Sequence, residues 1–103
     1  YTQMFAKFLA KLDSVPEGSG TMLDNSLVVW GSELGKGNSH SFERMPFVVA
    51  GGSGGNLETG RYLQYDKIEH NRLLVSVARL MGVAEQDKFG GTDAGSGGLS
   101  GFA

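Results

Sequence analysis

The stretch VVWGSELGKGNSH, residues 28–40, holds the side chains best suited to chemistry. A short apolar run ends at Gly31, and the loop after it carries an acid, Glu33, and one of the chain's two histidines, His40. A divalent metal ion accepts carboxylate and imidazole ligands together. In open α/β sheets, ligands bind beyond the carboxyl ends of the strands, where Glu33 is expected. The spacing therefore permits a shared metal site, although a catalytic zinc takes about three ligands from the protein.

Two other kinds of site fit this loop less well. GSELGKG resembles a phosphate-binding loop, but the spacer between its glycines is one residue short and Gly37 replaces the Ser or Thr that binds magnesium. Serines flank His40, as in a Ser-His nucleophile pair. No G-x-S-x-G elbow accompanies them, which argues against a serine hydrolase.

A purely structural role is the competing interpretation of the acid and the imidazole. Glu33 could cap a turn or pair with Lys36 or Arg44, and His40 could only hydrogen-bond within the loop. Spacing alone favours this interpretation. The second histidine, His70, precedes an amphipathic segment and is interpreted as a surface residue at the start of a helix.

Two helices are expected to support this loop. Residues 2–13 place Met4, Phe5, Phe8, Leu9 and Leu12 on one apolar face. The segment NRLLVSVARLMG predicts a second helix, with Asn71 as its cap and Gly82 as a left-handed residue after its end. One apolar face of this helix is lined by Leu73, Leu74, Val77, Leu80 and Met81. Because the first helical pattern begins at once, we expect a piece of a longer protein, cut inside or just before a helix.

Strands are expected on both sides of the loop. Residues 26–31 and 46–52 are continuous apolar runs rich in β-branched residues, typical of strands covered on both faces in parallel sheets. Residues 57–65 alternate weakly and predict an edge strand or hairpin arm. Residues 84–103 are expected to be a glycine-rich loop or tail. The predicted fold class is α/β: 1–103 is a single partial domain, the C-terminal part of a larger layered α/β sheet.

Composition excludes several classes of protein. The net charge is −2 and no Lys/Arg cluster exists, which argues against nucleic-acid binding. The absence of cysteine excludes disulfides and thiolate metal sites, and is compatible with export without arguing for it. No run approaches the ~20 apolar residues of a membrane span, and no signal peptide is visible.

The order of these motifs resembles the C-terminal part of the alkaline phosphatase and sulfatase superfamily. The segment LVVWGSELG, a later His before MPFVVAGG, and RLLVSVARLMGV carry the likeness. The sequence more closely resembles a group of exported bacterial proteins, the domain-of-unknown-function family numbered fifteen fifty-two. Members of that family carry similar LVVWGSE and LAGG segments. The likeness covers most of residues 19–92. It implies an alkaline phosphatase-like layered sheet and a periplasmic or secreted location.

The resemblance also implies a chemistry. The superfamily uses two metal ions for phosphoryl or sulfuryl transfer; Glu33 matches its Asp ligand and His40 its later His ligand. Leu34 stands where another His ligand belongs and cannot bind a metal. Arg44 and Asn38 are the implied substrate-binding residues for an anionic small molecule, Asn38 by shaping the loop.

Three hypotheses for the function follow from these observations. The first is metal-dependent hydrolysis of phosphate or sulfate esters with zinc, manganese or calcium, inactive in this chain because the nucleophile and other ligands would lie upstream. The second is a non-catalytic secreted binding or structural protein with a degenerate site, which Leu34 favours. The third is self-association through exposed strand edges.

Overall fold

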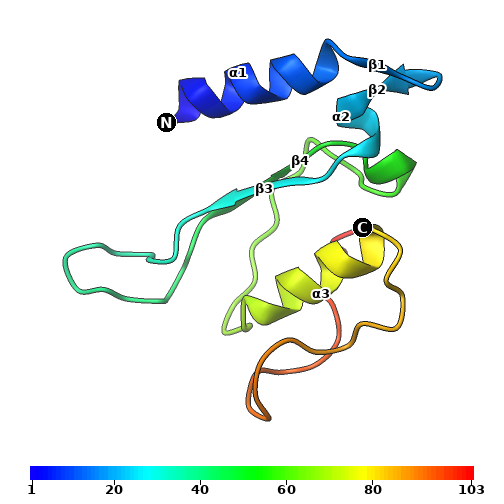
Figure 1. Ribbon diagram of the computed structural model, residues 1–103. Coiled ribbons are helices and arrows are strands. Elements are labelled where there is room, and N and C mark those ends of the chain that lie inside the picture. The colour runs from blue at the N-terminus through cyan, green and yellow to red at the C-terminus, as the bar shows by residue number, and fades with distance from the viewer.

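The structure is a computed structural model that describes all residues, 1–103, and it mixes helices with two small antiparallel sheets (Figure 1). This confirms the mixed helix and strand content, while an alkaline phosphatase-like arrangement stays a prediction. No helix combines the length and the apolar character that crossing a membrane requires. The elements are α1 (Thr2–Asp13), β1 (Pro16–Glu17), β2 (Gly20–Thr21), α2 (Met22–Asn25), β3 (Val28–Gly31), β4 (Phe47–Ala50), the 3₁₀ turn η1 (Ser53–Gly55) and α3 (Asn71–Leu80).

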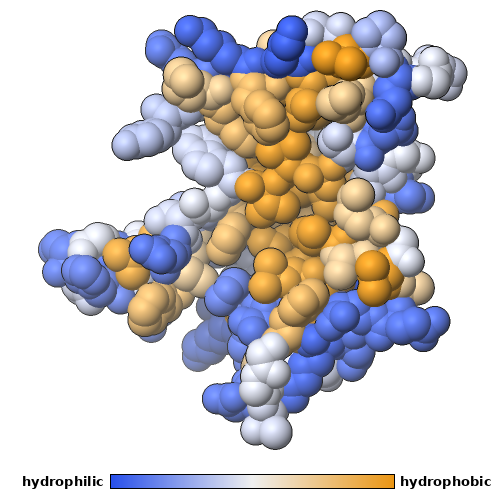
Figure 2. All heavy atoms as spheres, in the orientation of Figure 1, coloured by the Kyte–Doolittle hydropathy of each residue, from blue (hydrophilic) through white to orange (hydrophobic).

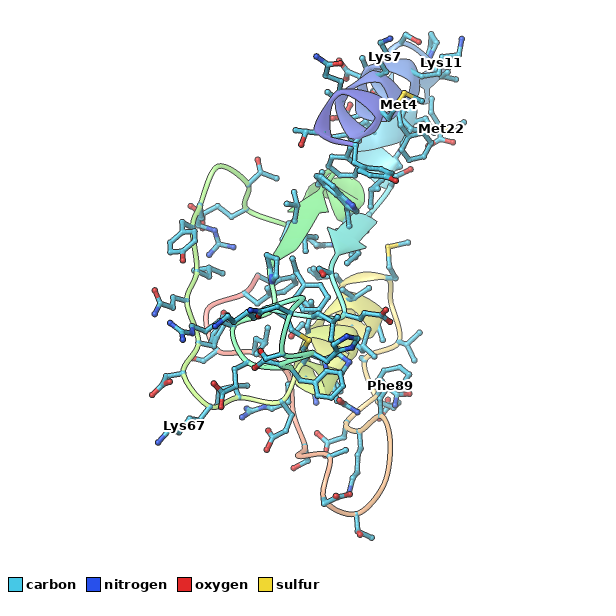
Figure 3. All side chains as sticks on the ribbon, turned by 90° about the vertical axis from the view of Figure 1, so that its left-hand side faces the viewer. Met4, Lys7, Lys11, Met22, Lys67 and Phe89 are labelled. Atoms are coloured by element: carbon cyan, nitrogen blue, oxygen red, sulfur yellow. The ribbon has the colours of Figure 1, made fainter.

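The first helix forms as predicted and lies over the larger sheet (Figure 1). Its contact with the sheet includes the rings of Phe5 and Trp30, whose centroids are 4.9 Å apart. Lys7 and Lys11 point away from the sheet on the outer side of α1 (Figure 3). Of the predicted apolar face, Phe5, Leu9 and Leu12 are half-buried, while Met4 and Phe8 remain exposed.

The segment TMLDNS forms the short helix α2. A capping box fixes its start: the Asp24 amide donates to Thr21 Oγ1 at 3.3 Å, and the Thr21 amide donates to Asp24 Oδ2 at 2.7 Å. The preceding strands β1 and β2 form a two-residue antiparallel pair that the sequence did not indicate. This compact unit connects α1 to β3.

The two apolar strands pair as an antiparallel hairpin, with Trp30 opposite Val48 and Gly31 opposite Phe47. The prediction of parallel-type strands buried on both faces is wrong within this chain, since 40% of Val29 and 46% of Val48 are exposed. A parallel pair needs a crossover connection, usually a helix, and only a loop joins β3 to β4. Apolar β-branched residues specify strand formation, but they do not specify the direction of pairing.

The hairpin lies between two helices. Side chains alternate across a strand, so Trp30 points toward α1 while Phe47 belongs to the opposite face. The Phe47 ring stacks on His70, at the start of α3, with centroids 6.2 Å apart and planes 11° apart. The layers therefore follow the order α1, hairpin, α3, as Figures 1 and 3 show from two directions.

The start of α3 differs from the prediction. His70 is the N-cap residue and makes no side-chain capping bond. Asn71 is already helical, and its Nδ2 donates to the Phe89 carbonyl at 2.7 Å instead of capping the helix. A residue that lies next to a helix start in sequence can be used elsewhere when a distant carbonyl comes within reach.

The end of α3 is as predicted. Gly82 has φ +93° in the left-handed region. Its amide donates to the Arg79 carbonyl at 3.1 Å, and the Val83 amide donates to the Ala78 carbonyl at 3.0 Å. These two bonds form a Schellman motif, which satisfies the last helical carbonyls.

The apolar face predicted for α3 is only partly buried: Val77 and Leu80 on it are half-buried. Leu73, Val75 and Ser76 are buried, whereas 41% of Leu74 and 53% of Met81 are exposed. The C-terminal segment packs on the side of the helix that carries Arg72 and Ser76. The Leu99 amide donates to Ser76 Oγ at 2.7 Å.

The segment 57–65 forms no strand, so that prediction is wrong. Its side chains instead hold the C-terminal segment: Arg61 donates to the Gly101 carbonyl at 2.8 Å and to the Phe102 carbonyl at 2.6 Å. Tyr65 Oη donates to the Ser100 carbonyl at 2.8 Å. Residues 84–103 contain no helix or strand, yet Phe102 is one of the few buried side chains.

Much apolar surface remains uncovered. The accessible surface is 7328 Å², against about 5,600 Å² expected for a compact protein of 10.9 kDa. The radius of gyration, 14.9 Å, likewise exceeds the roughly 13 Å of a compact domain of this length. An apolar band runs over the middle of the molecule (Figure 2), and exposed Met4 and Phe8 belong to α1.

Candidate functional site

A cavity of about 420 Å³ opens where β3 ends. It lies between the base of the hairpin loop, the start of β4 and the first turns of α3. Most of its lining is apolar; Glu33 is its only acid, and no Lys or Arg lines it. The lining residues are Gly31, Ser32, Glu33, Phe42, Met45, Phe47, His70 and Leu74.

The β3–β4 ladder and a local turn position Glu33. The Ser32 amide donates to the Pro46 carbonyl at 3.2 Å, which extends the hairpin pairing by one residue. Ser32 Oγ then donates to the Leu34 carbonyl at 2.9 Å and accepts from the Leu34 amide at 3.2 Å. These bonds hold the backbone on both sides of Glu33, an exposed residue of the cavity lining.

His40 lies at the other end of the loop. Lys36 and Ser41 form an antiparallel bridge across the loop, and the four residues between them make its tip. The His40 amide donates to the Gly37 carbonyl at 3.4 Å, and His40 has φ +50°. Glu33 lines the cavity and His40 does not. The two side chains therefore do not line this cavity together, and the assignment of either residue as a metal ligand stays a prediction.

The loop depends on a close backbone approach at Gly35. The Gly35 amide donates to the Ser41 carbonyl at 2.8 Å. A Cβ atom at this position would collide with the Glu43 carbonyl oxygen. Only glycine therefore allows the two sides of the loop to pack this closely.

His70 is the residue that sequence reasoning missed as part of a site. It was correctly predicted at the start of a helix, but its ring also lines the cavity that contains Glu33. The two residues are 37 positions apart, and no local motif links them. Only the packing of α3 beneath the hairpin, including the stacking of His70 on Phe47, brings them to one cavity.

The implied substrate-binding residues lie outside the cavity. Asn38 is exposed at the loop tip, and Arg44 is exposed with φ +53°. Neither lines the cavity. Glu33 forms no ion pair with Lys36 or Arg44, since the two ion pairs of the chain join Arg61 to Glu58 and Arg79 to Asp87.

The donor atoms within this chain do not make up a metal site by themselves. No group of three or more His, Asp or Glu side chains is gathered in a way that could hold an ion. Leu34, at the position where the resemblance implies a His ligand, is half-buried and offers no donor. We therefore derive no reaction step through a metal from residues 1–103.

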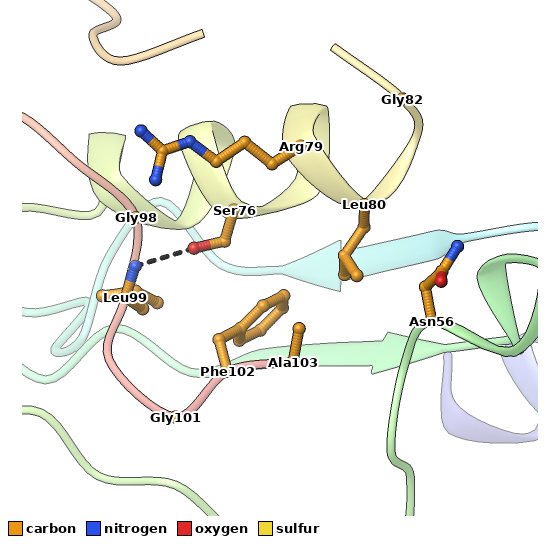
Figure 4. A pocket seen from close by; sticks show the side chains of 10 residues that line it. All are labelled: Asn56, Ser76, Arg79, Leu80, Gly82, Gly98, Leu99, Gly101, Phe102 and Ala103. Carbon is orange, nitrogen blue, oxygen red and sulfur yellow. Dashed lines mark hydrogen bonds between the residues drawn. The ribbon is translucent and has the colours of Figure 1, made fainter. Parts of the chain in front are cut away.

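A second cavity, of about 550 Å³, lies between α3 and the C-terminal segment (Figure 4). Its polar side chains are already engaged. Ser76 accepts from the Leu99 amide, and Arg79 donates to the Gln86 carbonyl and to Asp87 Oδ1, both at 2.9 Å. This cavity serves the docking of the C-terminal segment and offers no free catalytic group.

No family model matches the chain, and neither the curated proteins nor the solved structures contain a significant match to it.

Proposed function

We propose that this chain forms part of a domain that resembles the alkaline phosphatase and sulfatase superfamily and hydrolyses phosphate or sulfate esters with a divalent metal. The observation that carries the proposal is the place of Glu33, just past β3 and at the rim of the cavity between the sheet and α3. Open α/β proteins hold their ligands at such strand ends. In this proposal Glu33 is a metal ligand.

A bound divalent ion would neutralise the developing charge on the transferred group. In this proposal the chain contributes the hairpin, its two covering helices and the assigned ligands Glu33 and His40. It contributes no nucleophile, because Ser32, the serine of the cavity, already uses its hydroxyl on the Leu34 backbone. Residues 1–103 alone are therefore expected to be inactive toward esters.

The uncovered surface supports the view that further polypeptide completes the domain. The excess of about 1,700 Å² over a compact protein is twice the roughly 800 Å² that each partner buries in a standard complex. Both outer edges of the β3–β4 hairpin are unpaired, and no charged residue lies in either strand. Such edges readily accept another strand. We propose that further strands cover these edges in the whole domain, and that in the isolated chain a second copy does so.

The likeness to exported bacterial proteins also makes a periplasmic or secreted location part of the proposal. The absence of cysteine is compatible with export. Detection of the mature protein in a periplasmic or culture-medium fraction of the source cells supports this location. Detection of the protein in the cytoplasmic fraction alone contradicts it.

A non-catalytic binding role is the second candidate. The observation that favours it is Leu34, an aliphatic side chain where the resemblance implies a ligand, together with the absence of a three-ligand cluster. In that case the cavity would bind a small molecule without transforming it. The two candidates differ in whether Glu33 binds a metal.

Calorimetric titration of the full-length protein with zinc, manganese and calcium separates these candidates, because residues 1–103 do not make up a metal site by themselves. We expect Glu33→Gln to weaken the tightest binding by about tenfold or more. The matched control is Glu43→Gln, which alters an exposed acid of the same loop outside the cavity. Absence of binding, or equal binding by wild type and Glu33→Gln, contradicts the hydrolase proposal and favours the non-catalytic role. His40→Ala tests the second assigned ligand in the same assay.

A further inference from the structure

The cavity beside Glu33 is apolar on most of its walls. Phe42, Met45, Phe47 and Leu74 provide these walls. The Phe47 ring lies against Gly31, where a Cβ atom would collide with it. Aromatic rings and aliphatic groups gain free energy by removing apolar ligand surface from water.

The polar groups of the cavity are few. No Lys or Arg lines it, so the cavity itself has no cation for a phosphate, a sulfate or a carboxylate. The Ser32 hydroxyl is engaged with the Leu34 backbone as both donor and acceptor. A sugar or a nucleotide would therefore bury several hydroxyl or amide groups without partners, which is costly.

The size and the ring geometry fit an aromatic group. The volume of about 420 Å³ exceeds the roughly 150 Å³ cavity that encloses benzene, so it has room for one or two rings. His70 and Phe47 already stack nearly parallel at 6.2 Å on one side of the cavity. Aromatic ligands favour such offset or edge contacts with protein rings.

We infer that this cavity receives the organic group of the ester, and that this group is aromatic or otherwise apolar. The identity of the ligand as an ester rests on the proposed function. In this arrangement the organic end of the ester lies among Phe42, Met45 and Phe47, and its charged end lies outside these apolar walls. Sugar and nucleotide esters are poor ligands.

The test uses 4-methylphenol, a neutral mimic of the organic group, added without metal to the ¹⁵N-labelled chain. We expect saturable shifts of the amides of Gly31, Ser32 and Glu33, and none with ribose at the same concentrations. Phe42→Ser should weaken binding by about tenfold, and it preserves the fold because 73% of Phe42 is exposed. Tyr62→Ser, an exposed aromatic outside the cavity, is the matched control.

The inference is overturned by shifts that do not saturate, by equal binding of ribose, or by unchanged binding in Phe42→Ser. Because this experiment contains no metal, its result is independent of the calorimetric titration. Binding of 4-methylphenol without metal binding rejects ester hydrolysis but retains an apolar ligand in the cavity. Metal binding at Glu33 without binding of 4-methylphenol rejects the inference alone.

Discussion

Replacing Phe102 by alanine tests whether the C-terminal segment is an integral part of the fold. Only 7% of Phe102 is exposed, although it lies one residue from the end of the chain. Truncation of a buried Phe to Ala costs about 3–5 kcal/mol. We expect about 3 kcal/mol here, because the neighbouring cavity of about 550 Å³ allows the surroundings to relax.

Hydrogen exchange of the Leu99 amide measures this loss locally. That amide donates to Ser76 Oγ at 2.7 Å and is protected only while the segment is docked. A loss of about 3 kcal/mol corresponds to more than a hundredfold increase in the open fraction. Phe102→Ala should therefore reduce the protection of Leu99 by about that factor, while Phe102→Leu should retain most of it.

Tyr62→Ala is the control for this experiment, because 87% of Tyr62 is exposed and its removal should change stability by less than about 0.5 kcal/mol. Equal protection of the Leu99 amide in wild type and Phe102→Ala would refute the reasoning. In that case the bonds from Arg61 and Tyr65 to the segment's carbonyls, and not the buried ring, would hold it in place.

Two further substitutions test the loop and the sheet edge. Gly35→Ala should destabilise the chain by about 1–3 kcal/mol in urea unfolding, because the new Cβ atom collides with the Glu43 carbonyl oxygen. The control is Gly37→Ala, whose Cβ atom would have no neighbour within 4 Å and which should be nearly neutral. Equal loss of stability in the two variants would contradict the close backbone approach at Gly35. In sedimentation experiments, the apparent mass of the wild-type chain should rise with concentration. This rise should be smaller for Val29→Lys, which places a charge on the edge strand β3. A constant monomer mass, or an equal effect of Tyr62→Lys, would argue against pairing through this edge.

The local elements follow from neighbouring residues and could be predicted. The apolar periodicity of residues 2–13 produces α1, and Gly82 ends α3 in the left-handed conformation. The two apolar runs form strands near their predicted positions. Each of these features depends on interactions within a few residues of the chain, which sequence patterns report directly.

The failed predictions depend on long-range packing. The segment 57–65 alternates weakly, but Arg61 and Tyr65 bind the C-terminal carbonyls and no strand forms. Leu74 belongs to the most apolar stripe of α3 but remains exposed, since the segment that ends at Phe102 covers another face. Periodicity identifies an apolar face and does not identify what will cover it.

The sequence by itself determined where helices and strands form and that Glu33 follows a strand end, because backbone preference and side-chain spacing are local properties. Tertiary structure alone decided that the strands pair in opposite directions, that α1 and α3 cover opposite faces of the hairpin, and that His70 joins Glu33 at one cavity while His40 lies at the loop tip. Those outcomes depend on contacts between residues far apart in the chain, for which no local pattern exists.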